Sequence, residues 1–309
     1  MMARAYVSLD DLLKLSHRAR GFSFLPRQPV HSLLTGRHAS RLRGRGLDFD
    51  ELRHYAEGDD TRTIDWAATA RLGTPYVRVY REERDRSVLL LVDQRVSMFF
   101  GSRRATKSVV AAEVAALAAF RVASLGDRLG GIVYSEQGLT VIEPQARRAG
   151  VRRLLAALVQ HNNALDANVP RASGAALYNE ALRRAARFAK HDCLVVLVSD
   201  GSGQSPETMK LATELAAHND LIAIFIYDPL EADLPDIGRV VLAEGDRQIE
   251  VDLSAGDLRR RFASGFADWR ARIEHIALQR AIPVLPIRTD RDPAQQLRAL
   301  LGRRMRQAA

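Results

Sequence analysis

Residues 87–93, SVLLLVD, decide the fold class because they form an unbroken apolar run that ends in an aspartate. A strand with apolar side chains on both faces is typical of the centre of a parallel sheet. A helical pattern follows at 106–126, and the later apolar runs CLVVLVS, LIAIFIY and IPVLPIR alternate with further helical patterns. This alternation predicts an α/β fold with a doubly wound, mostly parallel sheet.

The composition sets limits on the class of protein. The chain has 309 residues, 47% of them apolar, and a single cysteine, Cys193, which lies inside an apolar run and cannot form a disulfide within the chain. The charged N-terminal sequence lacks the apolar segment of a secretory signal. No apolar run is long enough to span a bilayer, so we expect a cytoplasmic protein that does not span a membrane.

Three segments differ in character. We predict a helical basic arm at 1–35, an extension rich in Gly, Arg and Asp at 36–86 that packs on the sheet domain, and the sheet domain itself at 87–309. The first 46 residues hold nine Lys or Arg against two Asp, which is +7 of the net charge of +9. Such an arm favours an acidic protein surface, an anionic membrane surface or nucleic acid, or it is simply a solvated segment. It lacks a spaced set of aromatic residues, so nucleic acid is not the expected partner.

Ligands of doubly wound sheets bind at the carboxyl ends of central strands, and here two such strands end in Asp93 and Asp200. This pattern resembles the von Willebrand factor A domain, whose metal-ion-dependent adhesion site uses a D-x-S-x-S strand end, a later threonine and a later aspartate. The resemblance places Asp93, Ser97 and Asp200 at matching positions. The middle serine is replaced by Arg95, and the threonine position falls near Ala175.

The replacement by Arg95 affects the expected metal chemistry. An adhesion-type site would hold Mg²⁺ through hard oxygen ligands. A guanidinium is always charged and can pair with Asp93 or Asp200 where the metal would bind. We therefore expect no cofactor. Two alternatives stay open: a weak Mg²⁺ site built from Asp93, Ser97 and Asp200, or polar strand ends without chemistry.

The segment at 44–83, GRGLDFDELRHYAEGDDTRTIDWAATARLGTPYVRVYREE, carries a second resemblance. Its motif GDD-x-R-x-IDW is similar to the signature of the bacterial domain of unknown function 58, a family with a von Willebrand factor A-like fold. Members of this family are often encoded beside ATPases of the MoxR type, in the AAA+ class. The resemblance implies a chaperone-like interaction protein whose partners are such an ATPase and other von Willebrand A-like proteins.

The signature supports two interpretations. Its charged residues form either an ion-pair clamp that fixes the extension to the sheet domain or a docking surface on which Tyr55 and Trp66 are aromatic anchors. The residues concerned are Arg53, Tyr55, Gly58, Asp59, Asp60, Arg62, Asp65, Trp66 and Arg71.

Catalytic motifs are not apparent in the sequence. The Gly-rich stretch GDRLGG lacks the Lys-Ser/Thr of a phosphate-binding loop, and the eight histidines show no ligand spacing and no evident nucleophile partner. We therefore expect a non-catalytic interaction module. The alternatives are an Mg²⁺-dependent adhesion domain and a protein that binds nucleic acid or an anionic surface through its basic arm.

Overall fold

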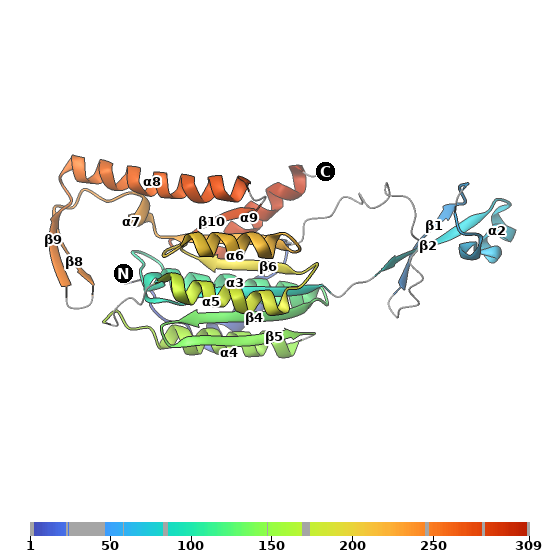
Figure 1. Ribbon diagram of the computed structural model, residues 1–309, viewed down its shortest axis with the longest axis horizontal. Coiled ribbons are helices and arrows are strands. Elements are labelled where there is room, and N and C mark those ends of the chain that lie inside the picture. Colours follow the sequence, from blue (N-terminus) through green and yellow to red (C-terminus); the bar gives the residue numbers. More distant parts are fainter. Residues whose placement is uncertain are drawn as a thin grey trace. The chain divides into compact units, whose positions relative to one another are not determined.

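The computed structural model describes residues 3–22, 24, 47–57, 59–82, 86–146, 148–168, 174–244, 247–279 and 282–307. The chain divides into two compact units (Figure 1). The sheet unit comprises Met1–Arg27 and Arg86–Ala309, and the signature unit comprises Gln28–Asp85. The predicted segment boundaries follow residues 35 and 86, and the two compact units divide after residues 27 and 85.

The sheet unit is built on six strands in the order β10-β7-β6-β3-β4-β5. Five are parallel: β3 (Ser87–Asp93), β4 (Arg128–Ser135), β6 (Leu194–Ser199), β7 (Asp220–Tyr227) and β10 (Val284–Arg288). The edge strand β5 (Gly138–Gln145) pairs antiparallel with β4. The predicted α/β fold with a doubly wound, mostly parallel sheet is confirmed.

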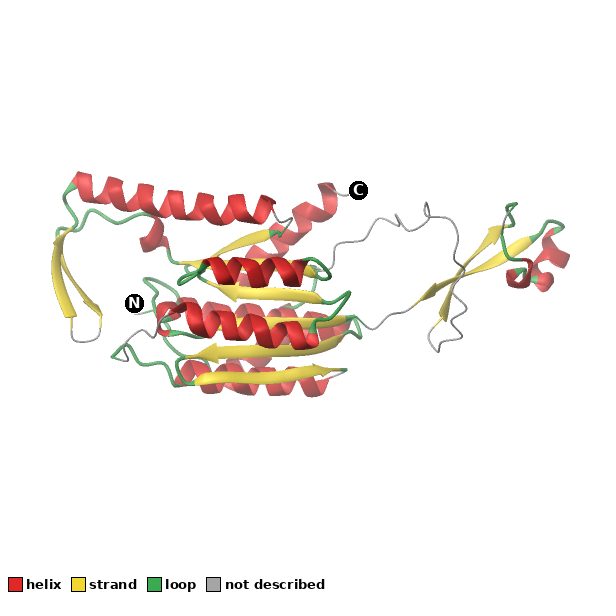
Figure 2. Ribbon diagram, in the orientation of Figure 1, coloured by secondary structure: helices red, strands yellow, loops and turns green. Residues whose placement is uncertain are grey.

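Helices cover both faces of this sheet (Figure 2). Val88, Leu90 and Val92 of β3 face a core formed with α3 (Lys107–Ser124), α4 (Arg148–Asn163) and α9 (Pro293–Gln307). Leu89 and Leu91 face the opposite core, formed with α5 (Gly174–Phe188) and α6 (Pro206–Ala216). Successive side chains of a strand point to opposite faces, so the unbroken apolar run of β3 serves two cores.

The described N-terminal residues, predicted as a helical basic arm, contribute to the first of these cores. Helix α1 (Leu9–Lys14) begins with the capping box Ser8 and Asp11 and continues into the short 3-10 helix η1 (Leu15–Arg18). The buried apolar residues of this segment are Val7, Leu12, Leu15, Ala19, Phe22 and Phe24. Burial of this apolar surface on the sheet unit, together with an ion pair from Arg4 to Glu113 of α3, fixes the segment.

A short helix, a hairpin and a long helix lie between β7 and β10 in the sequence. The short helix α7 (Pro229–Ala232) follows β7, and a hairpin of β8 (Arg239–Glu244) and β9 (Arg247–Asp252) precedes the long helix α8 (Gly256–Gln279). Phe266 and Trp269 of α8 pack against Phe225 of β7. Within the described parts of the chain, no helix is both long and apolar enough to span a membrane.

The signature unit consists of an antiparallel pair, β1 (Leu47–His54) and β2 (Tyr76–Glu82), with the 3-10 helix η3 (Thr61–Thr63) and helix α2 (Trp66–Leu72) between them. Among the described side chains of this unit, the only buried apolar ones are Ala68 and Val77. The described side chains of the unit therefore form very little core. The predicted packing of this extension against the sheet stays a prediction.

Candidate functional site

The carboxyl ends of β3 and β6 bring together the two aspartates that the sequence singled out. Strand β3 ends at Asp93, and Asp200 directly follows β6, its parallel neighbour. Both side chains are almost completely buried. A buried carboxylate is costly unless it is paired and hydrogen-bonded, so the surroundings of these two groups determine what the site can do.

Arg95 neutralises Asp93. Its Nε lies 2.9 Å from Asp93 Oδ1 and its Nη2 2.6 Å from Asp93 Oδ2, and its backbone N–H also donates to Oδ1 at 3.0 Å. The Ser199 hydroxyl donates to Oδ2 at 2.7 Å. The guanidinium also donates to the Ser202 carbonyl at 3.0 Å. The inward position of Arg95 agrees with the sequence prediction of a cation at this place.

The environment of Arg95 keeps it charged. Burial by itself would lower the pKa of the guanidinium, but the charge and hydrogen bonds of Asp93 raise it above its usual range. The guanidinium carbon also lies 5.6 Å from the ring centre of Tyr134 and 5.7 Å from that of Tyr178. Two aromatic rings and a bidentate carboxylate are the surroundings that suit a planar buried cation.

Lys107 neutralises Asp200, and sequence reasoning missed it. Its Nζ lies 2.9 Å from Asp200 Oδ2 and 2.5 Å from Oε1 of Glu231 on α7. Burial would lower the pKa of this amine, but the charges of Asp200 and Glu231 raise it. Conversely, burial would raise the pKa of Asp200, but the Lys107 charge lowers it. A signal was present in the sequence: Lys107 directly follows Thr106, the N-cap of an almost wholly apolar helix.

The remaining adhesion-type positions supply no ligand set. The Ser97 hydroxyl is buried and makes no hydrogen bond to the described protein. Ala175 lies in the first turn of α5, at the place predicted for the lost threonine. Ser173, the nearest hydroxyl in the sequence, is outside the described residues. Three positions match the adhesion motif. Of these, Ser97 makes no hydrogen bond to the described residues, and Asp93 and Asp200 are each paired with a cation.

These residues do not fit a divalent cation. Mg²⁺ needs about six oxygen ligands in near-octahedral geometry. Both oxygens of Asp93 accept hydrogen bonds from Arg95, and one oxygen of Asp200 is bound to Lys107. Within the part of the chain that the structure describes, no group of three or more His, Cys, Asp or Glu side chains is placed to hold a metal ion.

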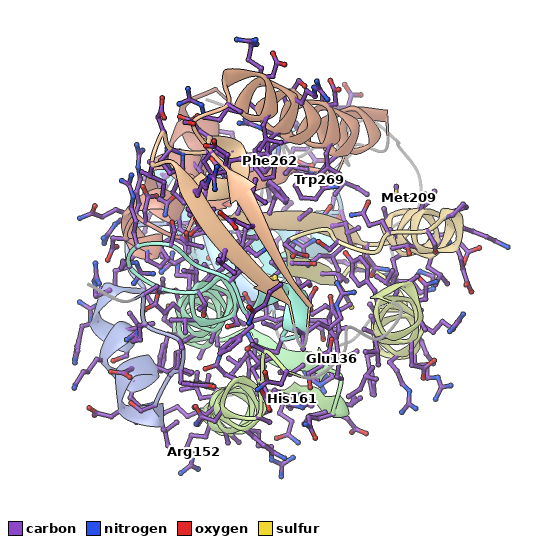
Figure 3. The ribbon with its side chains drawn as sticks, turned by 90° about the vertical axis from the view of Figure 1, so that its left-hand side faces the viewer. Glu136, Arg152, His161, Met209, Phe262 and Trp269 are labelled. Atoms are coloured by element: carbon purple, nitrogen blue, oxygen red, sulfur yellow. The ribbon has the colours of Figure 1, made fainter. Side chains whose placement is uncertain are left out.

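A second polar cluster lies near this edge, around the turn between β4 and β5. Figure 3 shows Glu136 of this turn close to His161 of α4. Both ring nitrogens of His161 are occupied, by Ser135 Oγ at 2.7 Å and Thr140 Oγ1 at 2.8 Å. No feature of the sequence indicated this serine–histidine contact. Ser135 is buried and its oxygen also accepts the Gln137 N–H, so the cluster has the features of a satisfied polar core.

Several signature residues form ion pairs or hydrogen bonds with residues that are close to them in the sequence. Arg53 pairs with Asp59 at 2.8 Å, which is a contact within the signature unit. A clamp from this unit to the sheet domain stays a prediction. Asp60 accepts the backbone N–H of Arg62 at the start of η3. Asp65 is the N-cap of α2 and accepts two backbone N–H groups at 3.0 Å. These carboxylates therefore order the turn and the helix start.

Other predicted clamp contacts differ from the expectation. The Arg62 side chain is exposed and forms no ion pair with the described residues. Arg71 donates to the Ala67 carbonyl of its own helix. Tyr55 is half-buried and Trp66 is 69% exposed. Gly58 lies outside the described residues.

Comparison with known proteins places the chain in a family. The model of the family described as "Protein of unknown function DUF58" matches residues 51–272. The chain belongs to the DUF58 family. The match begins in β1 of the signature unit and ends within α8 of the sheet unit, so both units are parts of the DUF58 pattern. The family resemblance predicted from the signature is confirmed.

The relatives of this DUF58 protein include uncharacterized proteins. Uncharacterized proteins of Mycobacterium tuberculosis and Mycobacterium bovis are 30% identical over 290 residues, covering 92% of this chain and 87% of each relative. Among solved structures, an aerotolerance-related membrane protein from Bacteroides fragilis aligns with a TM-score of 0.41 at 12% identity, covering 72% of this chain and 99% of that chain. A von Willebrand factor type A protein from Catenulispora acidiphila aligns with a TM-score of 0.35 at 15% identity, covering 74% of this chain and 44% of that chain.

Proposed function

We propose that this DUF58 protein is a non-catalytic, cytoplasmic protein-interaction module whose partner is a MoxR-type AAA+ ATPase acting in assembly or remodelling of other proteins. The kind of partner rests on the family resemblance of the signature. The contact that we assign to it is the exposed apolar surface of the signature unit.

The observation that carries this proposal is the exposure of Trp66. It is the first residue of α2, and its side chain is 69% exposed next to the well-ordered cap formed by Asp65. Leu72 at the other end of the same helix is 58% exposed. A solvent-exposed tryptophan on a helix is a side chain that often contributes to the centre of a protein interface.

The charged residues around Trp66 fit the rim of such an interface. Arg62 is exposed and without an ion pair among the described residues, and Asp60 lies on the same turn. Polar and charged groups at the rim of an interface steer association and exclude wrong partners. The two interpretations of the signature are thus compatible: Asp59 and Asp65 order the unit, while Trp66 and Arg62 remain available.

The alternative of a basic N-terminal arm has less support. Of the four described Lys and Arg residues of this segment, three have partners within the chain: Arg4 pairs with Glu113, Lys14 with Asp10, and Arg18 with Asp292, whereas Arg20 is exposed. Paired cations contribute less to long-range attraction of an anionic surface than unpaired ones do. The arginines at 27, 37, 41, 43 and 45 lie outside the described residues.

The test is binding of the purified full-length protein to a purified MoxR-type ATPase, measured by biolayer interferometry with ATP and with ADP. We expect Trp66→Ala to weaken binding by about tenfold or more, as for a central interface residue. Phe262→Ala is the matched control, since Phe262 is an exposed aromatic residue on α8 of the sheet unit, and it should bind as the wild type does.

Two results would contradict the proposal. Absence of binding by the wild type in both nucleotide states would remove the ATPase as partner. Equal loss in the Trp66 and Phe262 variants would remove the assignment of the contact. A lower melting temperature for Trp66→Ala with unchanged binding would remove Trp66 as the contact and would favour a structural role for the signature.

A further inference from the structure

Two internal cations, contributed by different elements, occupy the edge where an adhesion-type domain would hold its metal. Arg95 comes from the loop after β3 and pairs with Asp93. Lys107 comes from the start of α3 and pairs with Asp200. All four side chains are at least 97% buried.

We propose that Arg95 and Lys107 together replace the divalent cation, so that this edge is a metal-independent ion-pair network that also fastens α7 to the sheet. This inference does not depend on the proposed partner. It assigns Lys107 and Glu231 to a site that the adhesion motif does not include.

Each cation suits the carboxylate that it serves. The planar guanidinium of Arg95 matches both oxygens of Asp93, which is the geometry in which arginine binds carboxylates best. The compact ammonium of Lys107 bridges two separate carboxylates, Asp200 and Glu231. A single divalent ion at an adhesion-type site has to neutralise charge from several elements, and here two side chains share that task.

Glu231 extends the network to α7. Its Oε1 binds Lys107, and its Oε2 accepts the backbone N–H of Asp228 at 2.8 Å as part of a capping box. Asp228 is itself buried and accepts the hydroxyls of Ser102 and Thr289. The position of α7 at the end of β7 therefore depends on Lys107 rather than on a metal.

Entry of Mg²⁺ or Mn²⁺ into this network is unfavourable on two grounds. The ion would have to displace the hydrogen bonds of Arg95 from Asp93, which leaves a buried guanidinium without its partner. It would also place a charge of +2 beside two buried positive charges. Recognition of any partner at this edge therefore cannot use a metal-bridged carboxylate.

The first experiment uses the wild-type full-length protein, which requires no variant to fold. Calorimetric titration with Mg²⁺ and with Mn²⁺ should show no saturable site. The melting temperature should be the same in EDTA, Mg²⁺ and Mn²⁺. A saturable site for either ion, accompanied by a rise in melting temperature, would overturn the proposal.

The second experiment tests Lys107 directly. Lys107→Met should lower the melting temperature by about 5–10 °C, because it leaves Asp200 buried without its main cation. Lys210→Met is the matched control, since Lys210 is an exposed lysine on α6. It should melt as the wild type does. Equal melting of both variants would overturn the role of Lys107.

A double variant covers the case in which Lys107→Met does not fold. Lys107→Met with Asp200→Asn removes both members of the pair, so the unpaired buried charge is no longer present. The double variant should melt above the single variant, or fold where the single variant does not. If the double variant is no more stable than Lys107→Met, the network is not held by this charge pair and the proposal fails.

Discussion

Lys107 Nζ lies 2.9 Å from Asp200 Oδ2, although 93 residues separate the two in the sequence. Their contact joins the start of α3 to the end of β6 in a place almost closed to solvent. The burial that would raise the pKa of Asp200 is outweighed by the Lys107 charge, and the pKa is lowered. The pair therefore links the stability of the sheet edge to pH.

The pH dependence of the Lys107→Met variant should reveal this link. In the wild type, the lowered pKa of Asp200 means that its contribution to stability is complete above about pH 4, the unfolded value, and is lost as the pH falls through the folded-state pKa. In the variant, burial dominates and raises the pKa of Asp200, so protonation on acidification favours the folded state. The stability deficit of the variant should shrink between pH 7 and about pH 4.5.

Urea unfolding at the two pH values measures this effect. The quantity to compare is the difference in unfolding free energy between the wild type and Lys107→Met at each pH, with Lys210→Met as the control. A deficit that stays constant or grows on acidification would show that Lys107 does not set the protonation of Asp200.

The two serines near Asp93 should respond differently to substitution. The Ser97 hydroxyl is buried without a hydrogen bond to the described protein, so Ser97→Ala should leave the unfolding free energy within about 0.5 kcal/mol or raise it. Ser199 donates to Asp93 and accepts the Gly201 N–H, so Ser199→Ala should cost about 1–3 kcal/mol.

Chemical denaturation of the wild type, Ser97→Ala and Ser199→Ala measures these differences in unfolding free energy. A loss above about 1 kcal/mol for Ser97→Ala would mean that its hydroxyl has a role, such as holding a bound ion, and would revive the metal-site alternative.

The sequence predicts the sheet unit better than it predicts the partners of the buried charges. The apolar runs of β3 and β6 and the aspartates that follow them are local features, and their meeting at one edge is a consequence of parallel pairing. Arg95 is also predictable, because it is two residues from Asp93. The partners of Lys107 are not, although its place after the N-cap Thr106 marks it in the sequence, because its contacts with Asp200 and Glu231 depend on where a loop places the start of α3.

The N-terminal segment shows a second limit of sequence reasoning. A count of its charges predicted a basic arm that either meets an acidic or anionic surface or is simply solvated. The apolar residues Val7, Leu12 and Phe22 are too widely spaced to give a strong periodic signal, yet each fills a place in the core beside α3. Burial of a few large side chains outweighs a high density of exposed charge, since surface ion pairs contribute little to stability.

In the signature unit, substitutions of Asp65 and Arg62 should have different effects on stability. Asp65 caps α2 with two backbone hydrogen bonds, so Asp65→Ala should destabilise the signature unit by about 0.5–2 kcal/mol. The exposed side chain of Arg62 forms no ion pair with the described residues, so Arg62→Ala should change stability by less than about 0.5 kcal/mol. Hydrogen exchange of the amides in α2 and β2 measures the stability of this unit separately. Equal losses for both variants would indicate that Arg62 has a charged partner within the chain.

The neighbouring leucines Leu12 and Leu13 provide the sharpest test of the N-terminal packing. Leu12 is completely buried in the core beside α3, whereas Leu13 is 43% exposed on the outer side of the same helix. Leu12→Ala removes buried methyl groups and leaves a cavity, so it should cost about 2–5 kcal/mol. Leu13→Ala makes the same chemical change in the same helix, with the same helix propensity, and should cost less than about 1 kcal/mol.

Thermal and urea unfolding of the full-length protein measure both variants. Deletion of residues 1–24 should have a larger effect than Leu12→Ala, because it uncovers the apolar core in which Leu12, Phe22 and Phe24 are buried. The same deletion should leave the sheet unit prone to aggregate, since α3 would expose a continuous apolar face. A truncated protein that melts as the full-length protein does, together with equal values for Leu12→Ala and Leu13→Ala, would mean that residues 3–24 form a dispensable arm after all.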